Sequence, residues 1–215
     1  LLQGKKDRDV FFIEEGDPEK VAEQIVDLCS RRLPRYYKVN PISDIQVLCP
    51  MQRGETGTAN MNRLLQKALN QDIRFIRYGG TVFKVGDKVM QIRNNYDKNV
   101  FNGDIGQIED IDMEDRTLLI NFDGNIVEYD STELDEIVLA YAITIHKSQG
   151  SEYPIVVAPL TTQHYVMLQR NLLYTCITRA KKVFVLIGSL KALGISISNN
   201  KIVARNTRLA QRLME

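Results

Sequence analysis

The pattern of apolar residues changes twice along this chain of 215 residues, and that change limits the folds it can adopt. In residues 1–79 and again in residues 137–215, short apolar runs alternate with stretches of helical spacing. Such alternation is typical of an open α/β sheet whose parallel strands are joined by helices. In residues 80–136 the pattern switches to short strand-like runs separated by turn residues. We therefore expect one discontinuous α/β domain, residues 1–79 and 137–215, with a small β-barrel inserted at residues 80–136.

The first 79 residues carry clear helix and strand signals. Asp17-Pro18 is typical of a helix start, because Asp can cap the first turn and Pro is tolerated at the first helical position. We expect this helix to end at Pro34. Gly57–Asn70 predicts a second helix, while Val10–Ile13 and Ile45–Cys49 are typical of short strands.

The middle segment is punctuated by two turn pairs, Asn102-Gly103 and Asp123-Gly124. Such pairs favour tight turns between antiparallel strands. The strands expected around them are Lys88–Ile92, Ile105–Ile111, Thr117–Phe122 and Asn125–Tyr129.

The last third contains the most apolar run of the chain, Ile137–Ile145. We expect it to be a central strand covered on both faces. Ile155–Ala158 and Val183–Gly188 predict two further strands. The helices expected here are Val166–Thr178 and Val203–Leu213.

The net charge of +1 conceals an uneven distribution. Residues 80–136 carry 14 acidic and 5 basic side chains, whereas the other 158 positions carry 23 basic and 13 acidic ones. This asymmetry supports two folding units. The positive part is suited to a polyanion; the alternative is that its charges only keep the surface solvated.

The composition argues against several classes of protein. No apolar run approaches the roughly 20 residues that span a bilayer, so we expect no membrane partner. Cys29, Cys49 and Cys176 are far apart and odd in number, so they predict neither a disulfide framework nor a metal site. Because no charged-then-apolar leader is present, we expect a cytoplasmic location. Because the first residue is Leu1 and not Met, we expect a chain cut from a longer protein.

The segment Ala140–Pro154 concentrates chemically useful side chains directly after a buried run. In open α/β sheets, ligands bind where strands end in this way. A hydroxyl, an imidazole and an ammonium group suit phosphate oxygens. The alternative is a polar loop that only caps the sheet. The candidate residues are Thr144, His146, Lys147, Ser148, Gln149, Gly150 and Glu152.

The segment Asn171–Lys182 adds one further candidate, Arg179, between an expected helix and an expected strand. Arginine presents a fixed fork of donors that matches phosphate, and it can project toward a nucleotide held by a neighbouring domain. The alternative is a surface cation near a helix C-terminus. We expect His164 to be an ordinary loop histidine.

Several stretches together resemble a known family. HKSQGSE and LLYTCITRAKK are similar to motifs V and VI of superfamily 1 DNA helicases. Asp44–Asn70 and Gly86–Gly106 narrow the resemblance to the RecD-like branch, the exodeoxyribonuclease V alpha subunits and their stand-alone relatives. The resemblance implies a second RecA-like motor domain with an inserted Src-homology-3-like barrel. It also implies an ATP-driven helicase that moves 5′ to 3′ along single-stranded DNA and unwinds duplex for repair and recombination.

The resemblance also implies residue roles. Arg179 matches the arginine finger on the γ-phosphate. The positions that couple ATP to the strand match Gln149, Gly150 and Glu152. Positions close to DNA match Thr144, His146, Lys147 and Ser148, together with the barrel residues Asn94, Asn95 and Tyr96.

One departure from the family is decisive for activity. The chain contains no GxxxxGK[ST] phosphate loop and no following acidic pair for magnesium. ATP and Mg²⁺ would be held mainly by a first motor domain outside this chain, so we expect the isolated fragment to be inactive. The implied partners are that N-terminal RecA-like domain, single-stranded DNA and, where the parent acts in a complex, other exodeoxyribonuclease V subunits.

Two alternatives remain open at this point. One is a non-catalytic nucleic-acid-binding or partner-docking module that kept the fold without the motor. The other is the helicase segment of a conjugative relaxase, which shares these motifs.

Two expectations concern geometry. We expect Lys147, Glu152 and Arg179 to face one common groove. We also expect the first third of the barrel to face DNA, because its basic residues are Lys84, Lys88, Arg93 and Lys98.

Overall fold

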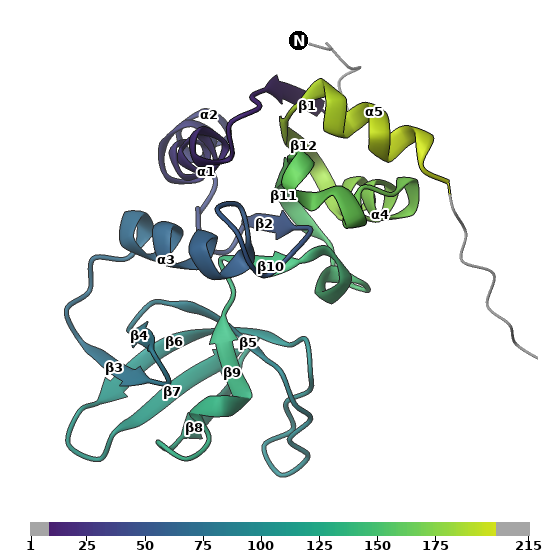
Figure 1. The fold of residues 1–215 in the computed structure, drawn as a ribbon. Helices are drawn as coiled ribbons and strands as arrows, with labels where there is room; N and C mark the ends of the chain where they lie inside the picture. The colour runs from purple at the N-terminus through teal and green to yellow at the C-terminus, as the bar shows by residue number, and fades with distance from the viewer. Residues whose placement is uncertain (1–8, 201–215) are drawn as a thin grey trace, which may run out of the picture.

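The computed structural model describes residues 9–200, which form a sheet domain and a smaller barrel (Figure 1). The sheet has five strands in the order β1-β12-β11-β2-β10, and every neighbouring pair is parallel. Their bounds are β1 Asp9–Glu14, β2 Ile45–Cys49, β10 Ala142–Thr144, β11 Tyr153–Leu160 and β12 Ala180–Gly188. The predicted parallel α/β architecture is confirmed.

Helices cover both faces of this sheet, as Figure 1 shows. Alternate strand residues point to opposite faces, so Val47 packs into one core and its neighbour Leu48 into the other. On the Val47 face lie α1 (Pro18–Asp27), α2 (Leu33–Tyr37) and α3 (Thr58–Leu69). On the Leu48 face lie α4 (Arg170–Thr178) and α5 (Leu190–Ser198).

The first helix begins as expected, with Asp17 accepting a hydrogen bond from the Glu19 amide at 3.0 Å. The expectation that Pro34 ends it is wrong. A π-turn over Leu28–Arg32 widens the helix, and the chain then continues into α2 with Pro34 in its first turn. Proline is tolerated there because a first-turn residue needs no amide hydrogen.

The barrel is a five-stranded antiparallel sheet in the order β8-β7-β6-β5-β9. The strands are β5 Lys88–Gln91, β6 Ile105–Asp112, β7 Thr117–Phe122, β8 Asn125–Tyr129 and β9 Ile137–Leu139. Its own apolar core includes Ile108, Leu118 and Ile120. The turn at Asp123-Gly124 has positive φ at both residues, 52° and 95°, as the sequence predicts for a tight hairpin.

A separate hairpin connects α3 to the barrel. It consists of β3 (Phe75–Tyr78) and β4 (Thr81–Lys84), which pair antiparallel around Gly79-Gly80. The barrel boundary that we expected at residue 80 falls inside this turn. Both glycines have positive φ, 53° and 85°, which the turn requires.

The expectation of one central strand over Ile137–Ile145 is wrong. The segment is divided between β9, which pairs with β5 in the barrel, and β10, which pairs with β2 at the edge of the parallel sheet. It is apolar because it passes from the buried barrel core into the buried sheet core, with Ala140 and Tyr141 buried between the two strands. Burial in two different sheets produces the same sequence pattern as burial in one.

The last third differs from expectation in two further ways. Thr162–Met167 forms a 3₁₀ turn, so the helix expected from Val166 begins only at Arg170. The α5 helix was not predicted. The helix predicted at Val203–Leu213 lies outside the described residues.

Candidate nucleic-acid interface

The loop from β10 to β11 runs from the carboxyl ends of the sheet strands to their amino ends. Thr144 pairs with Cys49 at the carboxyl ends of their strands, whereas Tyr153 pairs with Ala180 at the amino ends. A parallel connection must return in this way before the next strand can begin. The first residues of the loop therefore lie at the carboxyl ends of the strands, and its last residues lie at the amino ends.

The first half of the loop forms a 3₁₀ turn over Ile145–Ser148, with the Thr144 side chain accepting from the Lys147 amide at 3.4 Å. His146 and Lys147 are exposed on it. Ser148 is fully buried, and its hydroxyl donates to the Ile145 carbonyl at 2.7 Å. Ser148 thus holds the turn from inside and does not face a ligand in this structure.

A groove of about 640 Å³ lies between the sheet domain and the barrel. We call it the Lys147 groove. Thr144 and Lys147 line it from the loop, Arg63 from α3, and Val82 from the hairpin. Arg63 and Lys147 are the charged residues among the described ones that line it. Its partial burial in the groove lowers the pKa of Lys147. A cationic groove of this kind suits a phosphate backbone.

Arg179 lies at the other end of the loop. Its Nη1 donates to the Ser151 carbonyl at 3.0 Å, and its Nη2 donates weakly to Thr178 Oγ1 at 3.4 Å. In turn the Tyr153 amide donates to the Arg179 carbonyl at 2.8 Å. Its Nε is buried and has no hydrogen-bond partner among the described residues. These contacts join the two sequence segments that were singled out separately.

The structure does not place Lys147, Glu152 and Arg179 in one groove. Lys147 lines the Lys147 groove, but Glu152 and Arg179 are not among its lining residues. Glu152 is exposed at the amino ends of the strands, just before Tyr153. The reversal of the loop across the sheet separates them, and this reversal depends on topology that spacing along the chain does not reveal.

The end of the loop near Arg179 is open to solvent. Gln149, Gly150 and Glu152 are exposed in this part of the loop. Gly150 has φ of 89°, a conformation that other residues rarely adopt. The candidate residues of the loop therefore divide into one group at the groove and one group beside Arg179.

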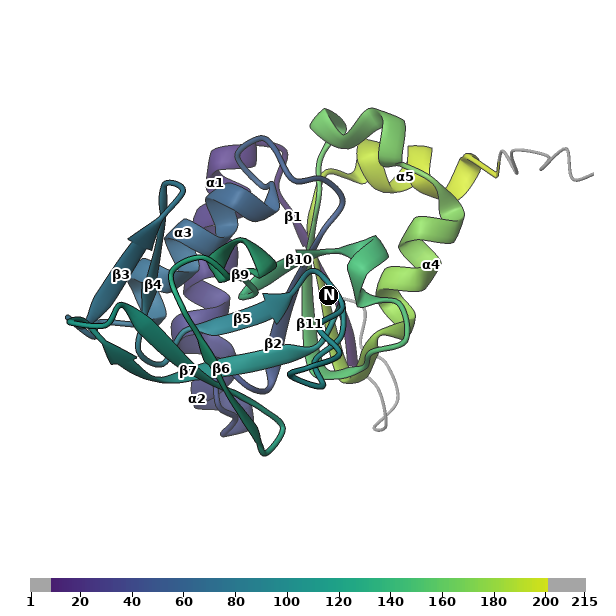
Figure 2. The same ribbon diagram turned by 90° about the horizontal axis from the view of Figure 1, so that it is seen from below.

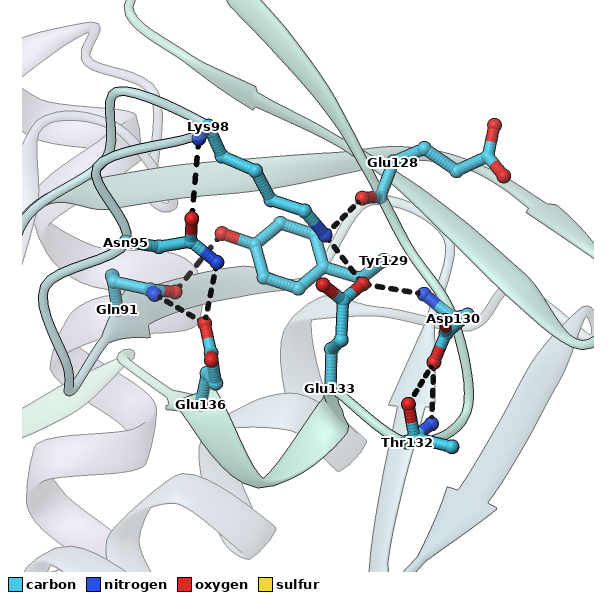
Figure 3. A network of polar contacts seen from close by, with 9 residues as sticks. All are labelled: Gln91, Asn95, Lys98, Glu128, Tyr129, Asp130, Thr132, Glu133 and Glu136. Atoms are coloured by element: carbon cyan, nitrogen blue, oxygen red, sulfur yellow. Dashed lines mark hydrogen bonds and ion pairs between the residues drawn. The ribbon is translucent and has the colours of Figure 1, made fainter.

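In the barrel segment at residues 94–96, the two asparagine side chains bond within the barrel and the tyrosine is exposed. Asn95 donates to the Glu136 carboxylate at 3.2 Å and accepts from the Lys98 amide at 3.1 Å, as Figure 3 shows, so it is part of the barrel's own polar network. The Asn94 side chain accepts from the Asn102 amide at 3.0 Å. Tyr96 is 76% exposed and packs edge-on against Phe101.

The expectation that the basic residues of the first third of the barrel face DNA is wrong for Lys88, which is buried, and the other three have partners within the chain. Lys88 is only 5% exposed, with its Nζ 3.4 Å from the Ile45 carbonyl and 5.7 Å from the centre of the Tyr153 ring. Arg93 pairs with Asp135 at 2.8 Å.

The other two basic residues of this region are engaged as well. Lys84 donates to the Asn70 carbonyl at 3.3 Å. Lys98 lies 4.3 Å from the centre of the Tyr129 ring, pairs with Glu133 and donates to the Glu128 carbonyl at 2.7 Å (Figure 3). An acidic barrel has enough carboxylates and carbonyls to satisfy its few cations locally.

Sequence reasoning missed a buried polar joint between α3 and the barrel. The Asp87 carboxylate is fully buried and accepts from Gln66 at 2.5 Å, from Asn70 at 2.7 Å, from the Tyr141 hydroxyl at 2.8 Å and from the Lys84 amide at 2.7 Å. Burial raises the pKa of Asp87, although these donors act in the opposite direction. We call these contacts the Asp87 joint.

The Asp87 joint ties together both connections between the two units. Asn70 ends α3, where the chain leaves the sheet domain, and Tyr141 lies where the chain returns. Asn62 reinforces the return by exchanging two hydrogen bonds with the Ala142 backbone, each of 2.8 Å. A sequence signal existed, since amide side chains recur every fourth residue at Asn62, Gln66 and Asn70 on one face of α3.

Among residues 9–200, no cluster of three or more His, Cys, Asp or Glu side chains is arranged to hold a metal ion. None of the helices in that range is long and apolar enough to cross a membrane. Cys29, Cys49 and Cys176 are buried free thiols, and burial raises the pKa of Cys29 to about 12.

Two protein families match this chain. Residues 61–122 match the SH3 domain of ATP-dependent RecD-like DNA helicases, and residues 139–187 match the UvrD-like helicase C-terminal domain. The first match covers most of α3, the hairpin and β5 to β7, and the second begins at the end of β9 and reaches almost to the end of β12.

Individual relatives agree with these matches. The ATP-dependent RecD2 DNA helicase of Deinococcus radiodurans is 38% identical over 79% of this chain and 23% of its own length. The RecBCD enzyme subunit RecD of Mycolicibacterium smegmatis is 28% identical over 80% of this chain and 30% of its own length. The chain thus spans less than a third of either relative. A solved structure of Pif1 helicase from Bacteroides with ADP-AlF3 and ssDNA aligns with 18% identity and a TM-score of 0.49, over 79% of this chain and 49% of that one.

Both family matches fall on the elements that build the groove and the Arg179 contact. The chain therefore belongs to the RecD-like DNA helicase family, of which it carries the SH3 domain and the UvrD-like helicase C-terminal domain.

Proposed function

We propose that this chain supplies the second motor domain of an ATP-dependent helicase that moves 5′ to 3′ along single-stranded DNA. One observation carries the proposal. A single loop begins at Thr144 in the Lys147 groove and ends at Ser151 against Arg179, so one short segment touches both candidate sites. A loop with two arrangements at such a position would couple events at the two sites. Unwinding of duplex DNA for repair and recombination in the cytoplasm is the process that the proposal implies.

The Lys147 groove is the proposed path of the DNA strand. Lys147 and Arg63 would neutralise phosphates, and Thr144 and His146 would donate hydrogen bonds to them. Contacts of this kind do not depend on sequence and weaken as salt is added. Asn94 and Tyr96 extend the proposal to the barrel loop, where the exposed Tyr96 ring offers a stacking surface.

ATP would lie at the Arg179 end of the loop. The buried and unpartnered Nε of Arg179 fits an incoming phosphate oxygen, because guanidinium groups bind phosphate through several N–H donors. Gln149, Gly150 and Glu152 border the same end, where Glu152 would accept from a ribose hydroxyl. Bound ATP supplies the phosphoryl group whose transfer drives movement, with Mg²⁺ held mainly by a first motor domain. Arg179 would stabilise the charge that develops on that group.

The site would have two kinds of protein partner. A first RecA-like domain would complete the nucleotide site, and other exodeoxyribonuclease V subunits would join where the parent protein works in a complex. The chain without that first domain is expected to bind single-stranded DNA weakly and not to turn over ATP.

The test uses the full-length parent protein. Arg179→Ala should reduce ATP turnover by about 10³-fold or more while leaving single-strand binding intact. Arg63→Gln and Lys147→Gln should each weaken strand binding. Each should also reduce the slope of log binding constant against log salt concentration by about one. Lys181→Gln removes an exposed cation of β12 and is the matched control for all three.

Two results would contradict the proposal. Near-normal turnover in the Arg179 variant would remove that residue from phosphate stabilisation. Unchanged DNA binding in both groove variants would leave a docking module without a motor as the better interpretation.

A further inference from the structure

The basic charge on the barrel side of the molecule is concentrated on α3 and the hairpin. Residues 58–84 carry five basic side chains and one acidic side chain, whereas residues 85–136 carry four basic and fourteen acidic ones. Figures 1 and 2 both show the hairpin strands beside α3, on the same side of the barrel. A polyanion that contacts both units would therefore be attracted to this side and repelled by the rest of the barrel.

The hairpin side contains a second hollow, of about 440 Å³, which we call the Phe75 hollow. Phe75, Arg77 and Lys84 line it, and the Arg77 guanidinium lies 5.3 Å from the centre of the Phe75 ring. Ile73, at the rim, is 86% exposed. Asp72 is the acidic residue among the described ones that line the hollow, and Arg74 pairs with it at 3.6 Å.

The Phe75 hollow adjoins the Lys147 groove. Gln66 and Val82 line both. The Gln66 amide donates to the Val82 carbonyl at 2.8 Å and to Asp87 at 2.5 Å, so the shared wall is held by the Asp87 joint. A nucleic-acid strand that lies in the groove would reach the hollow across this hydrogen-bonded wall.

We infer that the Phe75 hollow is a second contact for single-stranded nucleic acid, which extends the Lys147 groove onto the hairpin. An unstacked base would lie against the apolar surfaces of Phe75 and Ile73, and the neighbouring phosphates would pair with Arg77 and Lys84. Flat apolar surface next to fixed cations is the combination that binds bases together with their backbone. The inference rests on the proposed function, because it takes the groove as the path of the strand.

The experiment measures binding of this chain to oligothymidylates of two lengths by fluorescence anisotropy. One is about 6 nucleotides long, enough for the Lys147 groove alone, and the other is about 16 nucleotides long, enough to reach the Phe75 hollow as well. A longer oligonucleotide offers more overlapping positions at which one site can bind, which alone raises its apparent affinity. The wild-type chain should bind the longer oligonucleotide more tightly than this increase in positions explains. The double variant Phe75→Ala/Arg77→Gln should lose that gain, weakening the longer oligonucleotide by about 10-fold and leaving the shorter one unchanged.

The controls separate the hollow from the groove. Arg63→Gln/Lys147→Gln should weaken both lengths, since both use the groove. Tyr174→Ala/Lys181→Gln removes an exposed aromatic of α4 and an exposed cation of β12, neither of which lines the groove or the hollow, and should change neither length. Thermal unfolding of each variant checks that its fold is intact.

Three outcomes would overturn the inference. The hollow is excluded if the Phe75 and Arg77 double variant binds the longer oligonucleotide as wild type does. It is also excluded if Tyr96→Ala alone removes the length-dependent gain, because the second contact would then lie on the loop between β5 and β6 and not on the hairpin. If the wild-type chain binds neither length in a salt-dependent way, the groove itself fails and the proposed function falls with the inference.

Discussion

Arg179 and Ser151 are joined by a hydrogen bond of 3.0 Å from the guanidinium Nη1 to the backbone carbonyl, across 28 residues of sequence. The bond docks the last part of the β10–β11 loop on the end of α4. If the guanidinium turns so that Nη1 also binds a phosphate, the Ser151 carbonyl loses or shares its donor, and the loop would change its support when the phosphate arrives. The contact thus gives the proposed coupling a physical basis at the nucleotide end.

The first prediction concerns this bond in the chain alone. Arg179→Ala should speed amide hydrogen exchange over residues 149–152, because the loop loses its support, and should leave exchange in β2 unchanged. The loss in unfolding free energy should be modest, about 0.5–1.5 kcal/mol, since one hydrogen bond to a backbone carbonyl is removed. Hydrogen-exchange mass spectrometry measures both regions in one experiment.

Arg179→Lys is the informative companion, because lysine keeps the charge and loses the planar fork. It should leave exchange over residues 149–152 close to that of Arg179→Ala. If the lysine variant protected the loop as the wild type does, charge alone would hold the loop and the specific bond would be irrelevant.

Local chemistry explains the parts of the fold that were predictable. The strands Thr117–Phe122 and Asn125–Tyr129 were predicted to the residue, because their alternation and the Asp123-Gly124 turn are decided by neighbours in the chain. The Asp17 cap is equally local. The loop after β10 was identified because chemically active side chains follow a strand end, and Arg179 was identified as a fork of donors between an expected helix and an expected strand.

Topology explains what was not predictable. Ile137–Ile145 has the same apolar composition whether it belongs to one sheet or passes between two. The separation of Lys147 from Arg179 depends on the loop crossing the sheet, which spacing does not encode. The internal use of Lys88 depends on β5 packing against β2, and a charged residue in a strand gives no sign of such burial.

The second prediction tests the Asp87 joint. Asp87→Asn keeps the size of the side chain but turns an N–H₂ group toward one of two donor pairs, Gln66 with the Lys84 amide or Asn70 with the Tyr141 hydroxyl. Leaving buried donors unpaired costs about 1–3 kcal/mol each, and removal of the buried charge offsets part of that cost. We expect the free energy of unfolding, measured in urea, to fall by about 1–3 kcal/mol. The fall should be larger for Asp87→Ala, which leaves all four donors without their acceptor.

The Asp87 joint should also set the orientation of the barrel. Spin labels at Glu23→Cys on α1 and Glu114→Cys on the barrel are exposed, whereas the native cysteines are buried. The distance distribution between the labels should broaden in Asp87→Asn and stay narrow in Asp115→Asn, a change in an exposed turn. An unchanged distribution in the Asp87 variant would mean that apolar packing alone orients the barrel.

The third prediction concerns the buried Lys88. Burial lowers the pKa of Lys88 to about 8, although Asp44 acts in the opposite direction. The folded state therefore favours the neutral amine, and its ammonium form costs stability near pH 7. Unfolding free energy should rise as the pH increases from 7 to 9, and this rise should be absent in Lys88→Met.

At pH 7 the Lys88→Met variant should be at least as stable as wild type, since it keeps the apolar stem and removes a buried charge. Lys88→Glu should be strongly destabilised, because it buries a carboxylate beside the Ile45 carbonyl. Lys20→Met, an exposed change on α1, controls for the loss of a positive charge. A folded and stable Lys88→Glu variant would show that this side chain reaches solvent.

The last prediction concerns His164, which was expected to be an ordinary loop residue and is instead 2% exposed. Its Nε2 lies 3.0 Å from Thr56 Oγ1, which joins the turn after β11 to the loop before α3. Burial lowers the pKa of His164 to about 4 from its ordinary value of 6.5. The folded state thus requires the neutral ring, and the stability it contributes is complete above pH 6.5 and is lost as the pH falls toward 4.

Urea unfolding between pH 7 and pH 4.5 measures this loss, which should be on the order of 2–3 kcal/mol at most. His164→Gln should start less stable at pH 7, because the packing around the ring is lost, and should show a flatter decline with falling pH. His146→Gln is the matched control, since it changes the other histidine at an exposed position and should keep the wild-type slope. An equal slope in wild type and His164→Gln would mean that the buried ring accepts a proton without cost, and the contact with Thr56 would then persist in the protonated form.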